Sequence, residues 1–188
     1  MRLFVALPLP PEIADAAFHA LPELPGLRRV RPELMHVTLA FLGRTPDERL
    51  EDVSAAAQAA AEAVTAFDIE LDHVGRFPET GVPRIVWIGI GAGAQTALAL
   101  GERVRREIDR RQLERDRKPL RAHVTLGRVR EDIGVVDARK IAAAAEKIRL
   151  PHLRFRADRV VVFESVVSSK GPRYTARANV PLRVGGRS

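Results

Sequence analysis

The stretch MHVTLAFLG, residues 35–43, decides the fold, because its centre occurs twice in the chain. The letters HVTL at 36–39 return at 123–126, nearly half of the 188 residues later. β-Branched and apolar residues dominate both copies, which predicts a short strand at each. Side chains alternate between the two faces of a strand, so His and Thr share one face while Val and Leu share the other. The repeat predicts two similar halves that each contribute a His and a Thr to one cleft.

The candidate catalytic residues of this repeat are His36, Thr38, His123 and Thr125. Imidazole has an ordinary pKa of about 6.5, so it can take up or release a proton near neutral pH. Two imidazoles on opposite sides of one phosphorus could serve as acid and base, while the hydroxyls donate to the non-bridging oxygens. A metal bound by the two His is the weaker interpretation, because it leaves both Thr unexplained. We therefore expect neither a metal nor a cofactor.

The two motifs resemble those of the 2H phosphoesterase superfamily. Their flanks are similar to the branch of 2′-5′ RNA ligases, or RNA 2′,3′-cyclic phosphodiesterases. The similar stretches are RLFVAL at 2–7, FLG at 41–43, VW at 86–87, and FES at 163–165 followed by GPRY at 171–174. The resemblance covers essentially the whole chain, in order.

The resemblance implies a substrate: RNA that ends in a 2′,3′-cyclic phosphate, which water opens to leave a 2′-phosphate. It also implies His36 as the proton donor and His123 as the proton acceptor, although the two motifs alone are too alike to assign these roles. The same site run backward would join a 5′-hydroxyl in a 2′-5′ linkage without ATP. Two alternatives stay open: a phosphodiesterase acting on a small cyclic nucleotide or ADP-ribose cyclic phosphate, and a non-catalytic RNA-binding protein.

Three further residues are candidate substrate contacts. Arg128 holds in the second motif the place of Phe41 in the first, so a guanidinium that can grip a phosphate is paired with a ring that can stack a base. Arg121 stands two residues before His123 and therefore on the same face of its strand. Arg128 is five residues after His123, so strict alternation would point its side chain away from the cleft. A role for Arg128 in substrate binding therefore requires a twist or a bulge in the strand.

Composition narrows the class of protein. A hydrophobic content of 46% and a charged content of 29% are globular values. The net charge of +7 favours a polyanionic partner, and basic residues concentrate from 149 to the C-terminus. The absence of cysteine excludes a thiol nucleophile and suits a reducing cytoplasm. No apolar run reaches membrane-spanning length, so we expect no membrane partner. We also expect a cytoplasmic monomer.

Strands and helices mixed with hairpins predict an α+β fold. We expect strands at 2–7, 67–76, 84–90, 158–167 and 173–184 besides the two motifs, helices at 10–21, 46–66, 94–115 and 137–148, and a turn at 168–171. The arginines of the third helix alternate with acidic residues, which indicates a solvated face. We expect a single domain, 1–188, made of two lobes at about 1–91 and 92–188. The resemblance implies that a pseudo-twofold relates these lobes, with antiparallel sheets flanking a central cleft and the helices outside.

Overall fold

The computed structural model describes residues 1–169 and 171–185. Two single-turn 3-10 helices are labelled η. The elements in chain order are β1 (Arg2–Pro8), α1 (Pro11–Ala20), β2 (Leu27–Arg29), η1 (Pro32–Leu34), β3 (His36–Arg44), η2 (Asp47–Arg49), α2 (Leu50–Ala61), β4 (Phe67–Phe77), β5 (Ile85–Ile90), α3 (Ala94–Arg110), β6 (His123–Val129), α4 (Val135–Lys147), β7 (Leu153–Ala157), β8 (Arg159–Ser168) and β9 (Gly171–Pro181). The predicted α+β class is confirmed.

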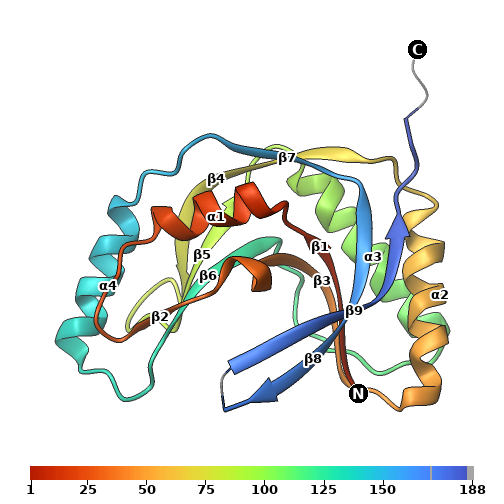
Figure 1. Cartoon of the computed structure of the whole chain (residues 1–188), viewed down its shortest axis with the longest axis horizontal. Coiled ribbons are helices and arrows are strands. Elements are labelled where there is room, and N and C mark those ends of the chain that lie inside the picture. Colours follow the sequence, from red (N-terminus) through yellow and green to blue (C-terminus); the bar gives the residue numbers. More distant parts are fainter. Residues whose placement is uncertain (170, 186–188) are drawn as a thin grey trace.

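The strands of the described residues form one curled sheet, in the order β7-β4-β5-β6-β3-β1-β8-β9, with β2 also paired to β6 (Figure 1). Neighbouring strands run antiparallel. The two motif strands, β3 and β6, meet at the centre of this order through the single pair Val37↔Val124. The two sheets predicted from the sequence are therefore joined at this pair into one.

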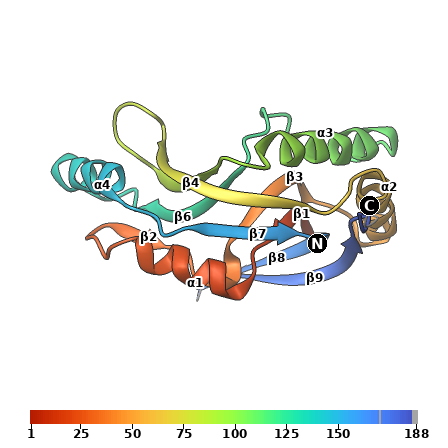
Figure 2. The ribbon, with the colours of Figure 1, turned by 90° about the horizontal axis from the view of Figure 1, so that it is seen from above.

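Two lobes lie on either side of that central pair. Lobe 1 consists of β3, β1, β8 and β9 with α2 and α3 packed on it, and lobe 2 consists of β6, β5, β4, β7 and β2 with α1 and α4. Figure 1 shows α1 and α4 toward one end of the molecule and α2 and α3 toward the other, an arrangement that Figure 2 shows from above.

The expected division into 1–91 and 92–188 is wrong as a description of these lobes. Strands β4 and β5 belong to lobe 2 although they precede residue 91, and β8 and β9 return to lobe 1 from the end of the chain. The cause is the pairing of β8 with β1, in which Phe163 stands opposite Phe4. Each lobe therefore needs residues from both ends of the sequence.

The core lies between the helices and the sheet face that carries the Val and Leu of the motifs. Val37, Leu39, Val124 and Leu126 are at most 1% exposed. Helix α2 buries Val53, Ala56, Ala57, Ala60 and Ala61, which recur at helical spacing and form one face. Because most of these side chains are methyl groups, α2 can pack closely against α3 and β8. The opposite face of the motif strands is left for the His and Thr side chains.

Three local expectations differ from the structure. Strand β7 was not predicted, although its sequence LRFRA alternates buried and exposed residues strictly. Helix α3 ends at Arg110 rather than near 115, and Gln112 after it has a positive φ of 54°. The arginines of α3 are not all solvated, because Arg105 is 9% exposed. Lys170, within the predicted turn at 168–171, lies outside the described residues.

Within the described ranges, no helix is long and apolar enough to cross a membrane.

Candidate active site

The central strand pair brings the two motifs together. Val37 and Val124 face each other in antiparallel register. Continuing that register by one residue places His36 across from Thr125 and His123 across from Thr38, all on the face away from the core. These four side chains are partly exposed, whereas both Val are buried. The structure thus unites the four residues predicted to be catalytic around one local twofold axis.

Both imidazoles are held in the same way. Nδ1 of His36 lies 2.8 Å from the carbonyl oxygen of Leu34, and Nδ1 of His123 lies 2.7 Å from that of Arg121. A carbonyl only accepts hydrogen bonds, so Nδ1 must carry the proton in each ring. Nε2 is then the nitrogen that can exchange a proton with a substrate. Among the described residues, neither Nε2 nor the hydroxyls of Thr38 and Thr125 have a hydrogen-bond partner.

The surroundings of the imidazoles disfavour their charged forms. Burial lowers the pKa of His36 to about 4; the charge of Arg128, and that of His123 when it is protonated, act in the same direction, whereas the hydrogen bond to Leu34 opposes this shift. Burial also lowers the pKa of His123, again with a contribution from Arg128. Both rings are therefore neutral near pH 7 in the free protein. A bound anion would raise both pKa values by favouring the charged form.

A bulge in each motif strand determines which face of the sheet the residues after the Thr point to. In β6, Thr125 pairs with Trp87 but Gly127 pairs with Val86, so Leu126 is an extra residue. Leu39 is the corresponding extra residue in β3, between Thr38 and Ala40. An extra residue reverses the alternation of the strand beyond it. The bulge that a role for position 128 required is therefore present in both strands.

Arg128 and Phe41 occupy equivalent places after these bulges, and both are on the cleft face. Arg128 is exposed, and its charge lowers the pKa of both His36 and His123. Phe41 is 36% exposed and stacks on Phe4, with ring centroids 5.5 Å apart. One lobe therefore presents a guanidinium to the cleft and the other presents a flat ring.

The carbonyl oxygen of the extra residue accepts a hydrogen bond in each bulge. The carbonyl oxygen of Leu39 accepts a hydrogen bond from Nε of Arg105, at 3.2 Å. The carbonyl oxygen of Leu126 accepts one from the backbone N–H of Val30, at 2.7 Å. A buried carbonyl left without a partner would be costly, so each bond stabilises its bulge. Arg105 was expected to be one of the solvated arginines of α3. It is instead buried, and its hydrogen bond to Leu39 stabilises the bulge of β3.

A cluster of aromatic side chains packs against His36, and it was not predicted from the sequence. Phe4 contacts the His36 ring, with centroids 4.8 Å apart, and the rings of Phe163 and Tyr174 lie 5.2 Å and 4.8 Å from Phe4. These rings supply the burial that lowers the pKa of His36. Phe4 and Phe163 lie within stretches that resemble the family, but their contact depends on the β1–β8 pairing, which the sequence did not reveal.

A second aromatic group borders His123. The rings of Phe77 and Trp87 lie 5.4 Å and 6.1 Å from the His123 ring. Gly75 makes room for Trp87, because a Cβ on Gly75 would fall 2.3 Å from the indole. Arg121 stacks over Phe77 at 5.0 Å and lies 3.4 Å from Glu79, so its guanidinium is directed at the β4–β5 loop. Its carbonyl, not its charge, makes the direct contact with His123.

Several of the basic residues near the C-terminus that the structure describes are paired with acidic side chains. Arg154 and Arg156 both pair with Asp68 on β4, and Arg177 pairs with Glu164. Ion pairs therefore engage part of this basic cluster within the described residues. The described residues also hold no group of three or more His, Cys, Asp or Glu side chains placed to bind a metal.

Two lobes that each contribute a His-x-Thr strand to the same face of one sheet define a two-histidine phosphoesterase. The model of the 2′-5′ RNA ligase superfamily matches residues 9–167. This chain belongs to that superfamily.

Individual relatives agree with this assignment. The chain is 34% identical to an RNA 2′,3′-cyclic phosphodiesterase of Archaeoglobus fulgidus, over 93% of this chain and 96% of the relative. It is 32% identical to an enzyme of that name from Thermus thermophilus, over 97% and 91%. A solved structure from Thermus thermophilus has a TM-score of 0.80 and 27% identity, and covers 99% of this chain and 100% of that one.

Proposed function

We propose that this protein hydrolyses 2′,3′-cyclic phosphate ends of RNA to 2′-phosphates, without a metal. One observation carries the proposal: two imidazoles, each fixed through Nδ1, lie on one face of the sheet with two Thr hydroxyls that have no hydrogen-bond partner among the described residues. The names of the relatives from Archaeoglobus fulgidus and Thermus thermophilus support the substrate. Reverse 2′-5′ joining without ATP is the same chemistry with a 5′-hydroxyl in place of water.

The mechanism needs one proton transfer on each side of the phosphorus. Nε2 of His123 takes a proton from water as the water oxygen bonds to phosphorus. The bond from phosphorus to O3′ breaks, and Nε2–H of His36 gives its proton to that oxygen. Thr38, Thr125 and Arg128 stabilise the charge on the non-bridging oxygens. The products are a 2′-phosphate and a 3′-hydroxyl.

The assignment of donor and acceptor stays a proposal. In the free protein a pKa of about 4 keeps His36 neutral near pH 7, so it can donate only after the anionic substrate raises that value. A substrate with sulfur in place of O3′ tests the assignment, because a thiolate leaves without a proton. We expect this substrate to restore much of the activity of His36→Ala and little of that of His123→Ala. The reverse pattern would exchange the two roles.

The direct test is the hydrolysis of a cyclic-phosphate oligonucleotide in the presence of EDTA. His36→Ala and His123→Ala should each reduce turnover by about 10²–10⁴-fold while the protein stays folded. Full activity in either folded variant would contradict the two-imidazole mechanism. Activity lost in EDTA and restored by a metal would contradict the metal-free mechanism, and RNA binding without turnover in the wild type would favour a non-catalytic RNA-binding protein.

Two further properties belong to the proposal. The cysteine-free composition supports a reducing compartment, the cytoplasm. The site is assembled within one chain, which supports a functional monomer. Cell fractionation and sedimentation of the purified protein, respectively, test these two statements.

A further inference from the structure

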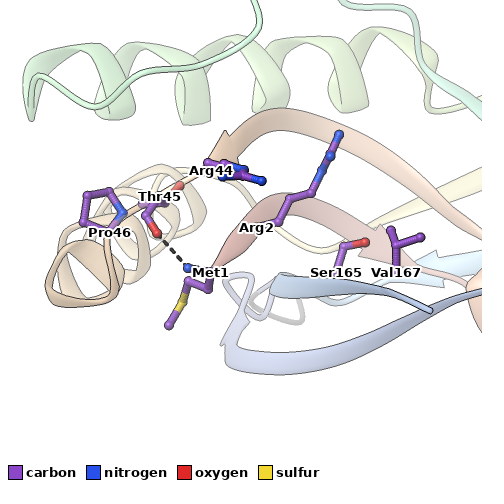
Figure 3. Close-up of a pocket in the computed structure, with 7 residues that line it drawn as sticks. All are labelled: Met1, Arg2, Arg44, Thr45, Pro46, Ser165 and Val167. Carbon is purple, nitrogen blue, oxygen red and sulfur yellow. Dashed lines mark hydrogen bonds between the residues drawn. The ribbon is translucent and has the colours of Figure 1, made fainter.

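A basic hollow lies at the far end of the cleft face of lobe 1. Its volume is about 570 Å³, and it is lined by Met1, Arg2, Arg44, Thr45, Pro46, Ser165 and Val167 (Figure 3). The lining includes no acidic residue. The nearby carboxylate of Asp47 is held by the N-terminal ammonium group at 2.8 Å. The hollow is large enough for a phosphate and its sugar and has a net positive charge.

Two arginines of this hollow stand directly opposite each other. Arg2 of β1 pairs with Arg44 of β3 in the antiparallel register. Within the described residues, neither guanidinium has a hydrogen-bond or ion-pair partner, although Arg44 also borders a second hollow that contains Glu114. Like charges directly opposite on neighbouring strands destabilise a sheet. An anion bound between the two guanidinium groups would remove this repulsion.

A chain of side-chain contacts leads from the hollow to His36. The guanidinium of Arg2 lies 5.9 Å from the centre of the Phe41 ring, and Phe41 stacks on Phe4, which contacts His36. Arg2 and Phe4 share the cleft face of β1 by alternation. Arg2 is four residues from Ala6, the partner of Thr38, and thus about 13 Å along the strand from the level of the catalytic Thr.

We propose that this hollow binds an internal phosphodiester of single-stranded RNA, on the 5′ side of the terminal nucleotide. The inference rests on the proposed function. With the cyclic phosphate between the histidines, the terminal base stacks on Phe41, and the chain continues beyond that ring to Arg2 and Arg44. Each guanidinium can donate two parallel hydrogen bonds to phosphate oxygens. A cyclic mononucleotide has no such phosphate, so the hollow selects oligonucleotides.

The test compares a cyclic-phosphate trinucleotide with a cyclic mononucleotide as substrates of the whole protein. Arg2→Ala and Arg44→Ala should each lower the ratio of the two kcat/KM values by about tenfold, the typical value of one charge-assisted contact. Arg106→Ala is the matched control, because Arg106 is an exposed arginine of α3 with no ion pair within the described ranges. This control should leave the ratio unchanged.

A neutral linkage makes the test specific for the phosphate. Replacing one internal phosphodiester of the trinucleotide by a methylphosphonate should lower kcat/KM in the wild type. In Arg44→Ala the same replacement should have little further effect, since the contact is already lost. An unchanged ratio in both arginine variants, or equal losses on both substrates, would overturn the inference. If the wild type hydrolyses neither substrate, the proposed function itself fails, which is a distinguishable result.

Discussion

At the scale of single residues, the surroundings of the two histidines favour their neutral forms and place a positive charge near both rings. The imidazole of His36 is half-buried among aromatic rings, and the charge of Arg128 lies near both His36 and His123. Each of these features disfavours an imidazolium ion. A substrate phosphate reverses the balance, so binding itself can prepare one ring to act as an acid.

This arrangement predicts a pH-dependent stability. The pKa of His36 is about 4 in the folded protein, against about 6.5 in an unfolded chain. Between these values the unfolded chain binds a proton that the folded protein does not, so stability falls as the pH drops from about 6.5 to about 4. Over this pH range, His36 lowers the free energy of unfolding by on the order of 3 kcal/mol in total. His36→Gln should lose less stability over this window in chemical denaturation. Equal pH profiles would contradict the lowered pKa.

The hydroxyls of Thr38 and Thr125 have no partner within the described part of the chain, as expected for groups that bind substrate. Thr→Val at either position keeps the shape of the side chain and removes the donor. We expect turnover to fall by roughly 10²-fold with little change in thermal stability. Thr→Ser, which retains the hydroxyl, should stay near wild type. Wild-type kinetics in both Val variants would show that the hydroxyls do not act in catalysis.

At the scale of elements, the bulges at Leu39 and Leu126 could not be predicted from the sequence. The letters HVTL predicted both strands and placed His and Thr on one face, because alternation is a local property. A bulge depends instead on the partner strand, and here on Arg105 and Val30, which satisfy the extra carbonyls from elsewhere in the chain. The sequence therefore showed that Arg128 requires a bulge to face the same side as His123, but it did not show that the bulge exists. Strand β7 has only five residues, and its place in the sheet depends on its pairing with the distant strand β4.

Arg105 is predicted to stabilise the bulge of β3. Its Nε donates to Leu39 and its Nη1 to the carbonyl of Lys118, at 3.2 Å and 2.9 Å, and the side chain is buried. Arg105→Ala leaves the Leu39 carbonyl without a partner and should cost about 1–3 kcal/mol in the free energy of unfolding. We also expect a raised KM, because Phe41 follows this bulge. Denaturant titration and steady-state kinetics measure the two effects, with Arg106→Ala as the neutral control.

At the scale of the whole molecule, the sequence predicted two related lobes but not how the chain is shared between them. Duplication of the motif indicates two halves, and the simplest interpretation cuts the chain in the middle. The pairing of β8 with β1 and of β4 with β7 overrides that interpretation, because each lobe completes its sheet with strands from distant parts of the chain. The chain passes between the lobes repeatedly, so neither lobe corresponds to a continuous segment.

This interleaving predicts that the lobes unfold together. Trp87, the single tryptophan, lies in lobe 2, whereas Arg105 supports β3 of lobe 1. If the lobes are one cooperative unit, Arg105→Ala should lower the denaturation midpoint seen by Trp87 fluorescence as much as the midpoint seen by far-UV circular dichroism. Lobes that unfold independently would instead leave the Trp87 transition where it is in the wild type. Because β3 and β6 share the pair Val37↔Val124, and His36 and His123 flank it, we expect the coincident result: loosening one motif strand removes the support of the other.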